Sequence, residues 1–280
     1  MRLRIGARLF EGPGPFVMGV VNATPDSFSD GGRFLSPDAA AAQAERLAEE
    51  GADLVDLGGE STRPGAAPVD AVEERRRVVP VVERLRARGF ALPISVDTSK
   101  AEVARAALEA GADLVNDVHG LADPALARVV ADAGAPVVLM HTRGTPATMQ
   151  DLAVYRDLLA EVAAELRQAL ARAVAAGVAE ERIILDPGLG FAKTPGQSVE
   201  LLARVGELRA LGRPLLVGPS RKRFIGHLTG APVEDRLPGT LAAVTACVLA
   251  GVELVRVHDV AAARQAAQVA AALRQAAILR

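Results

Sequence analysis

Short apolar runs alternate with longer amphipathic stretches along almost the whole chain. Eight runs are apolar nearly throughout, which is typical of strands buried on both faces, and we expect strands at residues 16–21, 54–57, 93–96, 114–115, 136–140, 183–185, 214–217 and 252–257. Stretches with helical spacing separate them, for example 36–50, 70–88, 99–110, 151–176, 199–209 and 259–279. Strands and helices in alternation predict a parallel sheet with right-handed crossovers.

Glycines and capping residues mark the ends of these elements. The phrase Gly-Ala-Asp-Leu-Val occurs at 51–55 and again at 111–115, each time where an Ala-rich amphipathic stretch gives way to an apolar run. Glycine is common just after a helix, so both phrases predict a junction from helix to strand. Ser36-Pro37 predicts a helix start, and Ser99 with Glu102 fits a capping box.

Eight strand–helix units in 280 residues favour one architecture. A closed (β/α)₈ TIM barrel has this number of units and about this length. A doubly wound open sheet more often carries a Gly-x-Gly-x-x-Gly turn after its first strand, and none follows residues 16–21. No linker or change of composition divides the chain, so we expect an α/β fold with a single (β/α)₈ barrel domain over residues 1–280.

Composition and charge exclude several classes of function. Half of the residues are apolar, and the formal net charge is -2. A chain without a basic field is a poor binder of polyanions, so we expect no nucleic-acid partner. The amino-terminal residues have no apolar core of signal-peptide length, the longest weakly polar run, around residues 241–252, is too short for a membrane span, and Cys247 is the only cysteine. We therefore expect a cytoplasmic protein with no membrane partner, no disulfide and no cysteine-based zinc site.

Polar residues follow every predicted strand. They are Asn22, Asp56, Glu60, Ser61, Asp97, Asn116, Asp117, His141, Asp186, Ser220, Arg221, Lys222, Arg256 and His258. A single Asp or Asn after a strand is more often a helix cap or a turn residue. Eight such coincidences favour an active site, because catalytic residues in these barrels lie at the carboxyl ends of the strands.

This rim divides into two chemical parts. Asp97, Asn116 and Asp186 offer carboxylate and amide groups that suit a flat heterocycle with an amino-pyrimidine edge. Asn22, Arg256 and His258 supply donors that suit a phosphate. Lys222 lies between the two groups; it could contact a ring atom, or it could act as a Schiff-base nucleophile. Lysine is rare in this chain, since only Lys100, Lys193 and Lys222 accompany 29 arginines.

Two connections, 22–36 and 58–68, are long and polar. Ordinary Gly and Pro turn chemistry explains them as well as a functional role does. Both follow neighbouring strands at the active rim, so they could also close over one ligand and exclude water.

The motifs together carry a resemblance to a known family. NATPDSFSDGG, DLGGESTRPG, SVDTSK, Asn116-Asp117, MHTRGTPATMQ, LDPGLGFAK, PSRKRFIG and RVHD occur in that order, and the likeness runs from about residue 16 to 279. The chain resembles the dihydropteroate synthases. The resemblance implies a (β/α)₈ barrel that joins 6-hydroxymethyl-7,8-dihydropterin diphosphate to p-aminobenzoate, giving 7,8-dihydropteroate and diphosphate for folate synthesis, with sulfonamides as competitors.

The resemblance also implies roles for individual residues. The pterin would be held by Asp97, Asn116, Met140, Asp186, Gly218 and Lys222. The diphosphate would be bound by Asn22, Arg63, Arg256 and His258, with Asn22 also reaching the Mg²⁺ that the family requires. The p-aminobenzoate pocket and the closed loops would be shaped by Thr24, Pro25, Asp26, Phe28, Thr62, Arg63, Pro64, Phe191 and Lys222. Asp97, Asp186, Lys222, Arg256 and His258 would be the catalytic set.

Family likeness further implies a homodimer formed through the late, Ala-rich helices. Three positions depart from the family pattern: Ala23 stands where a branched residue is common, His119 where Ser or Thr is frequent, and Arg223 where many members have Ser. The last leaves open which contact, if any, residue 223 makes with p-aminobenzoate.

Our mechanistic hypothesis is a transfer led by C–O cleavage, in which the carboxylates stabilise positive charge on the ring and the cationic groups stabilise the leaving diphosphate. Three alternatives stay open: a corrinoid-dependent methyltransferase on a related pterin-binding barrel, a Lys222 aldolase, and a pterin-binding homologue without catalysis. A zinc hydrolase is disfavoured, because no His-x-His pair ends the first strand.

Overall fold

Eight parallel strands form a barrel in which spatial order follows chain order. The strands are β3 (Phe16–Asn22), β4 (Leu54–Gly58), β5 (Ile94–Asp97), β6 (Leu114–Asp117), β7 (Val137–Met140), β8 (Ile183–Asp186), β9 (Leu216–Val217) and β10 (Leu254–Val257). β10 pairs with β3, and a bridge between Leu185 and Leu215 joins β8 to the β9 side and completes the ring. The computed structural model describes all residues except 24–35, 62–65 and 279–280. The predicted barrel and its eight strands are confirmed.

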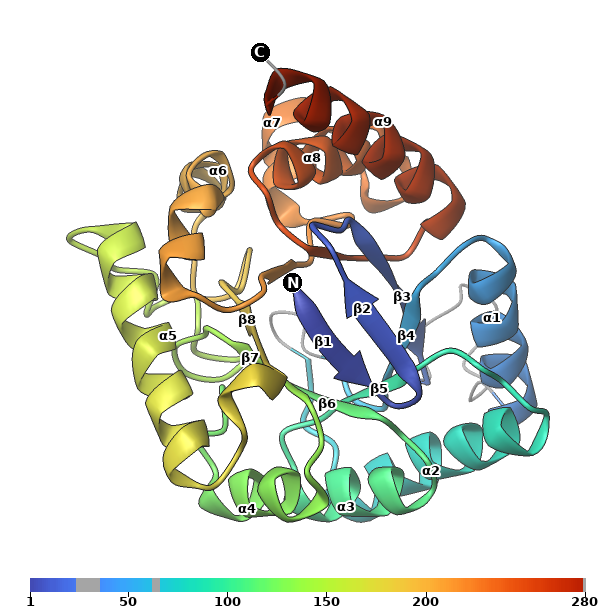
Figure 1. The fold of residues 1–280 in the computed structure, drawn as a ribbon. Helices are drawn as coiled ribbons and strands as arrows, with labels where there is room; N and C mark the ends of the chain where they lie inside the picture. The colour runs from blue at the N-terminus through green and yellow to red at the C-terminus, as the bar shows by residue number, and fades with distance from the viewer. Residues whose placement is uncertain (24–35, 62–65, 279–280) are drawn as a thin grey trace.

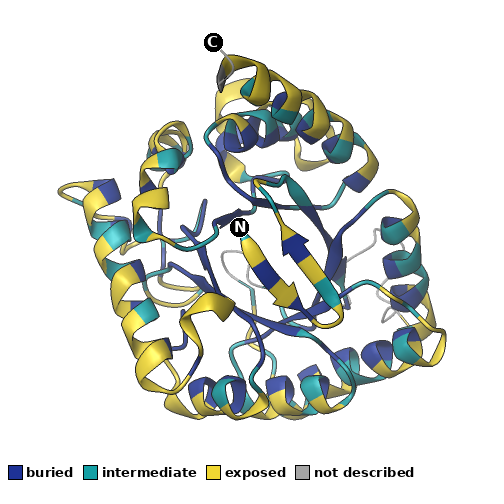
Figure 2. Ribbon diagram, in the orientation of Figure 1, coloured by how far each residue is buried: buried dark blue, intermediate teal, exposed yellow. Residues whose placement is uncertain are grey.

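Helices surround the barrel, as Figure 1 shows. They are α1 (Pro37–Glu49), α2 (Ala71–Ala87), α3 (Ala101–Glu109), α4 (Pro124–Ala133), α5 (Leu158–Ala175), α6 (Pro195–Ala203), α7 (Arg223–Thr229), α8 (Leu237–Leu249) and α9 (Val260–Ile278), with short 3₁₀ turns at Glu180–Arg182, Val205–Leu211 and Val233–Asp235. Their inner faces are buried and their outer faces exposed (Figure 2). In the described part of the chain, no helix combines the length and the apolar character that crossing a membrane requires.

The caps explain where several helices begin, and they correct one prediction. Ser36 accepts a hydrogen bond from the Ala39 amide, as expected for a cap ahead of Pro37. The capping box predicted at Ser99 is wrong. Lys100 is the cap position of α3 and makes no side-chain cap, while the Ser99 hydroxyl donates to Asp117 at 2.5 Å.

Two predicted helices have different bounds. The one predicted from residue 151 begins only at Leu158, where Asp157 caps α5. The one predicted at 199–209 is two elements. A capping box between Thr194 and Gln197 starts α6 early, and the chain continues after Ala203 as a 3₁₀ turn. Gly206 in that turn lies so close to Ala250 that a Cβ there would be 3.0 Å from its carbonyl oxygen.

A hairpin that the sequence analysis did not predict closes the amino end of the barrel. β1 (Arg2–Ile5) and β2 (Arg8–Glu11) pair antiparallel and lie across the strands in Figure 1. Leu3, Ile5 and Phe10 are at most 3% exposed, and they pack on the inward side chains of the barrel strands. The barrel is therefore filled from this end, which leaves its carboxyl end for a site.

Inward-facing positions change from apolar to polar along the strands. The layer beneath the hairpin consists of Met18, Leu54, Leu114, Val138, Ile184, Leu216 and Leu254. Side chains alternate between the two faces of a strand, so the next inward position lies two residues further on. Those positions hold Val20, Asp56, Asn116, Met140, Asp186, Gly218 and Arg256, of which four are polar, and Asp97 on β5 is in register with Asn116. The polar layer is the floor of the candidate site.

Candidate active site

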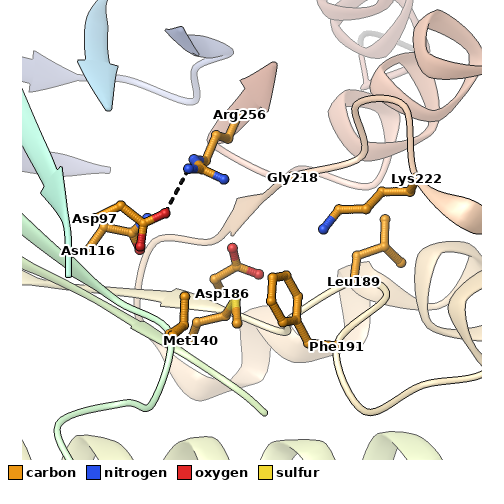
Figure 3. A pocket seen from close by; sticks show the side chains of 10 residues that line it. Asp97, Asn116, Met140, Asp186, Leu189, Phe191, Gly218, Lys222 and Arg256 are labelled. Atoms are coloured by element: carbon orange, nitrogen blue, oxygen red, sulfur yellow. Dashed lines mark hydrogen bonds and ion pairs between the residues drawn. The ribbon is translucent and has the colours of Figure 1, made fainter. Parts of the chain in front are cut away.

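A pocket opens above the polar layer at the carboxyl ends of the strands. It is lined by Asp97, Asn116, Val118, Met140, Asp186, Leu189, Phe191, Gly218, Lys222 and Arg256. Figure 3 shows the charged ends of Asp97, Asp186, Lys222 and Arg256 pointing toward a common space. The pocket thus offers two carboxylates and two cations around one common space.

Arg256 joins strands from different sides of the barrel. Its Nη2 donates to Asp97 Oδ2 at 2.9 Å, and its Nε donates to Asp56 Oδ2. Asp56 is fully buried and also accepts from Asn116 Nδ2 at 3.1 Å. One carboxylate beneath the pocket therefore orients both a cation and an amide of the site, which fixes which edges they present.

Burial sets the protonation behaviour of the two carboxylates in the pocket. It raises the pKa of Asp186 to about 6, although the Gly188 amide, Lys222 and Arg256 all act in the opposite direction. Burial also raises the pKa of Asp97, with the charges of Asp56 and other carboxylates adding to the effect and Arg256 opposing it. Buried carboxylates with raised pKa values are common in functional sites.

The turn after β8 places an aromatic ring beside the lysine of the pocket. Lys222 Nζ lies 4.4 Å from the centroid of the Phe191 ring, which is a cation–π distance. Gly188, in the same turn, donates its amide hydrogen to Asp186 Oδ1 at 2.7 Å. A Cβ at Gly188 would lie 1.9 Å from the His141 carbonyl oxygen, so only glycine allows this approach.

The loops after β9 and β10 are tied to each other. Ser220 Oγ lies 2.9 Å from His258 Nδ1 and accepts from the His258 amide at 3.2 Å. Arg221 has a φ of 55° and forms a bidentate pair with Asp259, at 2.7 and 3.1 Å. These contacts fix the backbone immediately before Lys222 and hold the His258 ring at the rim.

The structure gathers the residues predicted to bind a ring. Asp97, Asn116, Met140, Asp186, Gly218 and Lys222 all line the pocket, together with Phe191 and Arg256. Asn22 ends β3 and His258 follows β10, so both lie at the same rim but outside the pocket lining. The predicted loop residues Thr24, Pro25, Asp26, Phe28, Thr62, Arg63 and Pro64 lie outside the described residues.

Other polar residues of the rim have different tasks. Asp117 does not line the pocket. Its carboxylate stabilises the turn after β6 by accepting hydrogen bonds from the amides of His119 and Leu121. Ala23 is buried, with its amide bonded to the Gly58 carbonyl, and Arg223 is exposed at the start of α7. His119 is half-buried and lines a second, wider cavity together with residues of α5, among them the buried Leu166 and Ala169.

Sequence reasoning gave no role to Asp56, and it did not single out Val118 or Leu189. Asp56 follows Leu54 by two residues, so strand alternation alone places it on the inner face once β4 is recognised as a barrel strand. Val118 and Leu189 belong to irregular turns, where no periodicity reports which way a side chain points.

The residues at the rim also limit how a metal could be held. Within the described ranges, no group of three or more His, Cys, Asp or Glu side chains could ligate an ion. Asn22 presents one hard oxygen at the end of β3. Mg²⁺ retains water and takes phosphate oxygens readily, so this donor set fits a magnesium ion carried mainly by a diphosphate.

Comparison with known proteins agrees with this geometry. Residues 18–258 match the family model described as pterin binding enzyme. A dihydropteroate synthase of Synechocystis is 48% identical over 274 residues, which is 97% of this chain and 94% of that protein. A Yersinia pestis dihydropteroate synthase in a sulfonamide drug complex superposes with a TM-score of 0.93 at 43% identity, covering 98% of this chain and 100% of that one. A Xanthomonas albilineans dihydropteroate synthase with 4-aminobenzoic acid gives a TM-score of 0.91 at 50% identity, covering 98% of each chain. The chain therefore belongs to the pterin-binding enzyme family, among the dihydropteroate synthases.

Proposed function

We propose that this protein condenses 6-hydroxymethyl-7,8-dihydropterin diphosphate with p-aminobenzoate to give 7,8-dihydropteroate and diphosphate, a step of folate biosynthesis. The observation that carries the proposal is the pocket itself, in which two buried carboxylates and an amide face two cations at the carboxyl end of the barrel. Relatives that carry this activity in their names span nearly the whole chain, and one of them holds 4-aminobenzoic acid.

The polar layer suits the pterin ring. An amino-pyrimidine edge presents two parallel N–H groups, and an ionised carboxylate accepts both. We assign this edge to Asp186, which lines the pocket and is 6% exposed, because Asp97 Oδ2 already accepts from the Arg256 guanidinium. The Gly188 amide fixes the orientation of the Asp186 carboxylate. Asn116 can donate to and accept from the same ring, because Asp56 fixes its amide orientation. Met140 and Phe191 supply apolar surface beside it.

The charged groups of the site can stabilise the charges that develop during transfer. We assign C–O cleavage as the leading event, because an electron-rich dihydropterin stabilises positive charge on its exocyclic carbon. Diphosphate leaves with the electron pair of that bond, and the amine nitrogen of p-aminobenzoate then forms the new C–N bond and releases a proton. Asp97 and Asp186 then stabilise the ring, and Arg256, His258 and Asn22 face the departing diphosphate. Bound Mg²⁺ would neutralise charge on the diphosphate, with Asn22 as its protein ligand. Sulfonamides would compete with p-aminobenzoate beside Phe191.

Two further assignments rest on the same family likeness. We place the protein in the cytoplasm. We also propose a homodimer through α8 and α9, whose outer faces expose Leu249, Val269 and Leu273 by 46%, 61% and 57%. Sedimentation velocity over a range of concentrations tests the dimer, and a monomer at every concentration would contradict it.

The reaction is tested by following dihydropteroate formation from the two substrates with Mg²⁺, with EDTA, and with a sulfonamide. We expect product that requires the metal and that falls with sulfonamide in competition with p-aminobenzoate. Tight pterin binding without product would support the assignment of the pocket to the pterin ring but would exclude the proposed reaction. Borohydride trapping of a carbonyl substrate on Lys222 would favour an aldolase instead.

A further inference from the structure

Lys193 is one of only three lysines in the chain, and the proposed reaction does not use it. It lies after the turn that follows β8 and is 2% exposed. Its Nζ is within hydrogen-bond distance of the Gly188 carbonyl at 3.1 Å, the Phe191 carbonyl at 3.0 Å and His141 Nδ1 at 2.9 Å. A buried lysine amino group therefore lies at the centre of the turn 187–192, within hydrogen-bond distance of three uncharged groups.

The contacts of this amino group determine the state of His141. Burial lowers the pKa of Lys193 to about 7, with the charge of Asp186 opposing the shift. In its charged form the group has only donors, so His141 Nδ1 then accepts from it and the ring carries its proton on Nε2. His141 Nε2 lies 2.9 Å from Glu165 Oε2 and donates to it, and Arg143 holds the same carboxylate. Burial lowers the pKa of His141, which agrees with a neutral ring, and the bond from His141 is the largest cause that lowers the pKa of Glu165 to about 2. The chain of donors runs from Lys193 to His141 to Glu165.

The same turn carries two features of the pocket. Gly188 offers its carbonyl to Lys193 and its amide to Asp186 Oδ1, at 2.7 Å. Phe191 offers its carbonyl to Lys193, and its ring lies beside Lys222 in the pocket lining. The backbone is unusual here, since Ala192 has a φ of 46°. Three acceptors that converge from different directions suit a tetrahedral ammonium, whereas a planar guanidinium would need more room.

We infer that Lys193 is a positioning residue, which folds the turn 187–192 around its ammonium and so fixes the Asp186 carboxylate and the Phe191 ring. This inference deepens the proposed function and rests on it for the identity of the two substrates. Phe191 is bound directly through its own carbonyl, while Asp186 is reached only through Gly188. Loss of the ammonium therefore affects the site of the aryl amine more than that of the pterin.

Tyr155 offers a readout that does not depend on activity. It is the only tyrosine in a chain without tryptophan, and its hydroxyl donates to the Ala192 carbonyl at 2.9 Å. Its fluorescence therefore reports on the turn that Lys193 holds. In Lys193→Met, which keeps the length of the side chain and removes the donors, we expect acrylamide to quench Tyr155 at least about 2-fold more strongly than in the unchanged protein.

Kinetics measure the consequence for the site. We expect Lys193→Met to raise the KM for p-aminobenzoate about 10-fold or more, which is the size of one charged hydrogen bond, with a smaller change in the Kd of a pterin ligand. Lys193→Arg should rescue neither the quenching nor the KM, because its fork cannot meet three converging acceptors.

Arg86→Met is the matched control, because the Arg86 side chain also binds three acceptors but lies at the opposite end of the barrel. Its guanidinium donates to the carbonyls of Gly111, Phe90 and Leu92. This variant should lose thermal stability with its Tyr155 quenching and KM unchanged. A Lys193→Met protein with unchanged quenching and KM would overturn the inference. So would an equal change of quenching and KM in Lys193→Met and Arg86→Met, because the effect would then follow from lost stability alone. Failure of the unchanged protein to form dihydropteroate would contradict the proposed function alone, since the quenching result would still decide whether Lys193 holds the turn.

Discussion

Arg256 and Asp97 are joined across the top of the barrel, with Arg256 Nη2 donating to Asp97 Oδ2 at 2.9 Å. Their strands, β10 and β5, are separated in the sheet by β3 and β4. The guanidinium therefore links the part of the rim assigned to the diphosphate with the part assigned to the ring. A substrate that carries both groups would find the two halves of its site already held in register.

Asp56 makes this arrangement possible, and its replacement is our first prediction. Asp56→Asn keeps the shape but removes the charge that binds Arg256 Nε and orients Asn116. We expect kcat/KM for the pterin diphosphate to fall about 10- to 100-fold, as for loss of a buried charged hydrogen bond. Steady-state kinetics check this.

Asp53→Asn is the control for that experiment. Asp53 likewise accepts from two side chains, here Arg8 and Arg264, but at the amino end of the barrel. This variant should lose stability with its kinetic constants unchanged. Equal kinetic losses in both variants would mean that Asp56 acts only on the fold.

Asp186→Asn separates activity from stability. We expect kcat/KM to fall at least about 100-fold, because an amide cannot accept both N–H groups of the ring edge. Asp123→Asn, which alters only the cap of α4, should retain turnover. Near-normal activity of Asp186→Asn would contradict the role of this carboxylate.

The same variant is expected to be more stable without ligand. Burial raises the pKa of Asp186 to about 6, so its contribution to stability is fully present below the ordinary carboxyl pKa and is lost as the pH rises through about 6. Above that pH the buried charge costs the folded state roughly 3 kcal/mol. Urea unfolding at pH 8 should show Asp186→Asn to be more stable, with the difference disappearing at pH 4.

Ring binding should depend on pH for the same reason. Asp186 accepts two N–H groups only when it is ionised, so the affinity for a pterin ligand should decline as the pH falls below about 6. Calorimetric titrations between pH 5 and 8 measure the decline, and the Asp186→Asn protein should show a flatter profile at lower affinity. The same pH dependence in both proteins would assign the titration to another group.

The sequence predicted the barrel well, because both of its signals are local. Strands buried on two faces are apolar runs, and Gly51 and Gly111 do adopt positive φ values, 97° and 110°, at the predicted junctions. Strand ends meet at one rim in this fold, so the positions of Asp97, Asn116 and Asp186 followed from topology alone.

Contacts between distant segments could not be predicted in this way. Ser99 resembles a helix cap, but its hydroxyl binds Asp117 on the next strand, which no local pattern reveals. Lys193 and His141 belong to separate motifs, and only the folded chain shows that they share a hydrogen bond. The amino-terminal hairpin had a weak signal, an alternation of Arg and apolar residues around Gly6, but each of its strands is only four residues long.

That hairpin gives the last prediction, which concerns stability. Phe10 is 1% exposed and contacts the Phe16 ring edge-on, with the centroids 5.0 Å apart. Phe10→Ala should lower the free energy of unfolding by about 3–5 kcal/mol, because it leaves a cavity against the apolar layer of the barrel. Leu9→Ala, at the 39% exposed neighbouring residue, should lower the free energy of unfolding much less.

Since the hairpin and the pocket lie at opposite ends of the barrel, Phe10→Ala should keep its kcat/KM at temperatures where it stays folded. A loss of kcat/KM in the folded variant would show that the apolar layer, besides filling the barrel, sets the height of the polar layer above it.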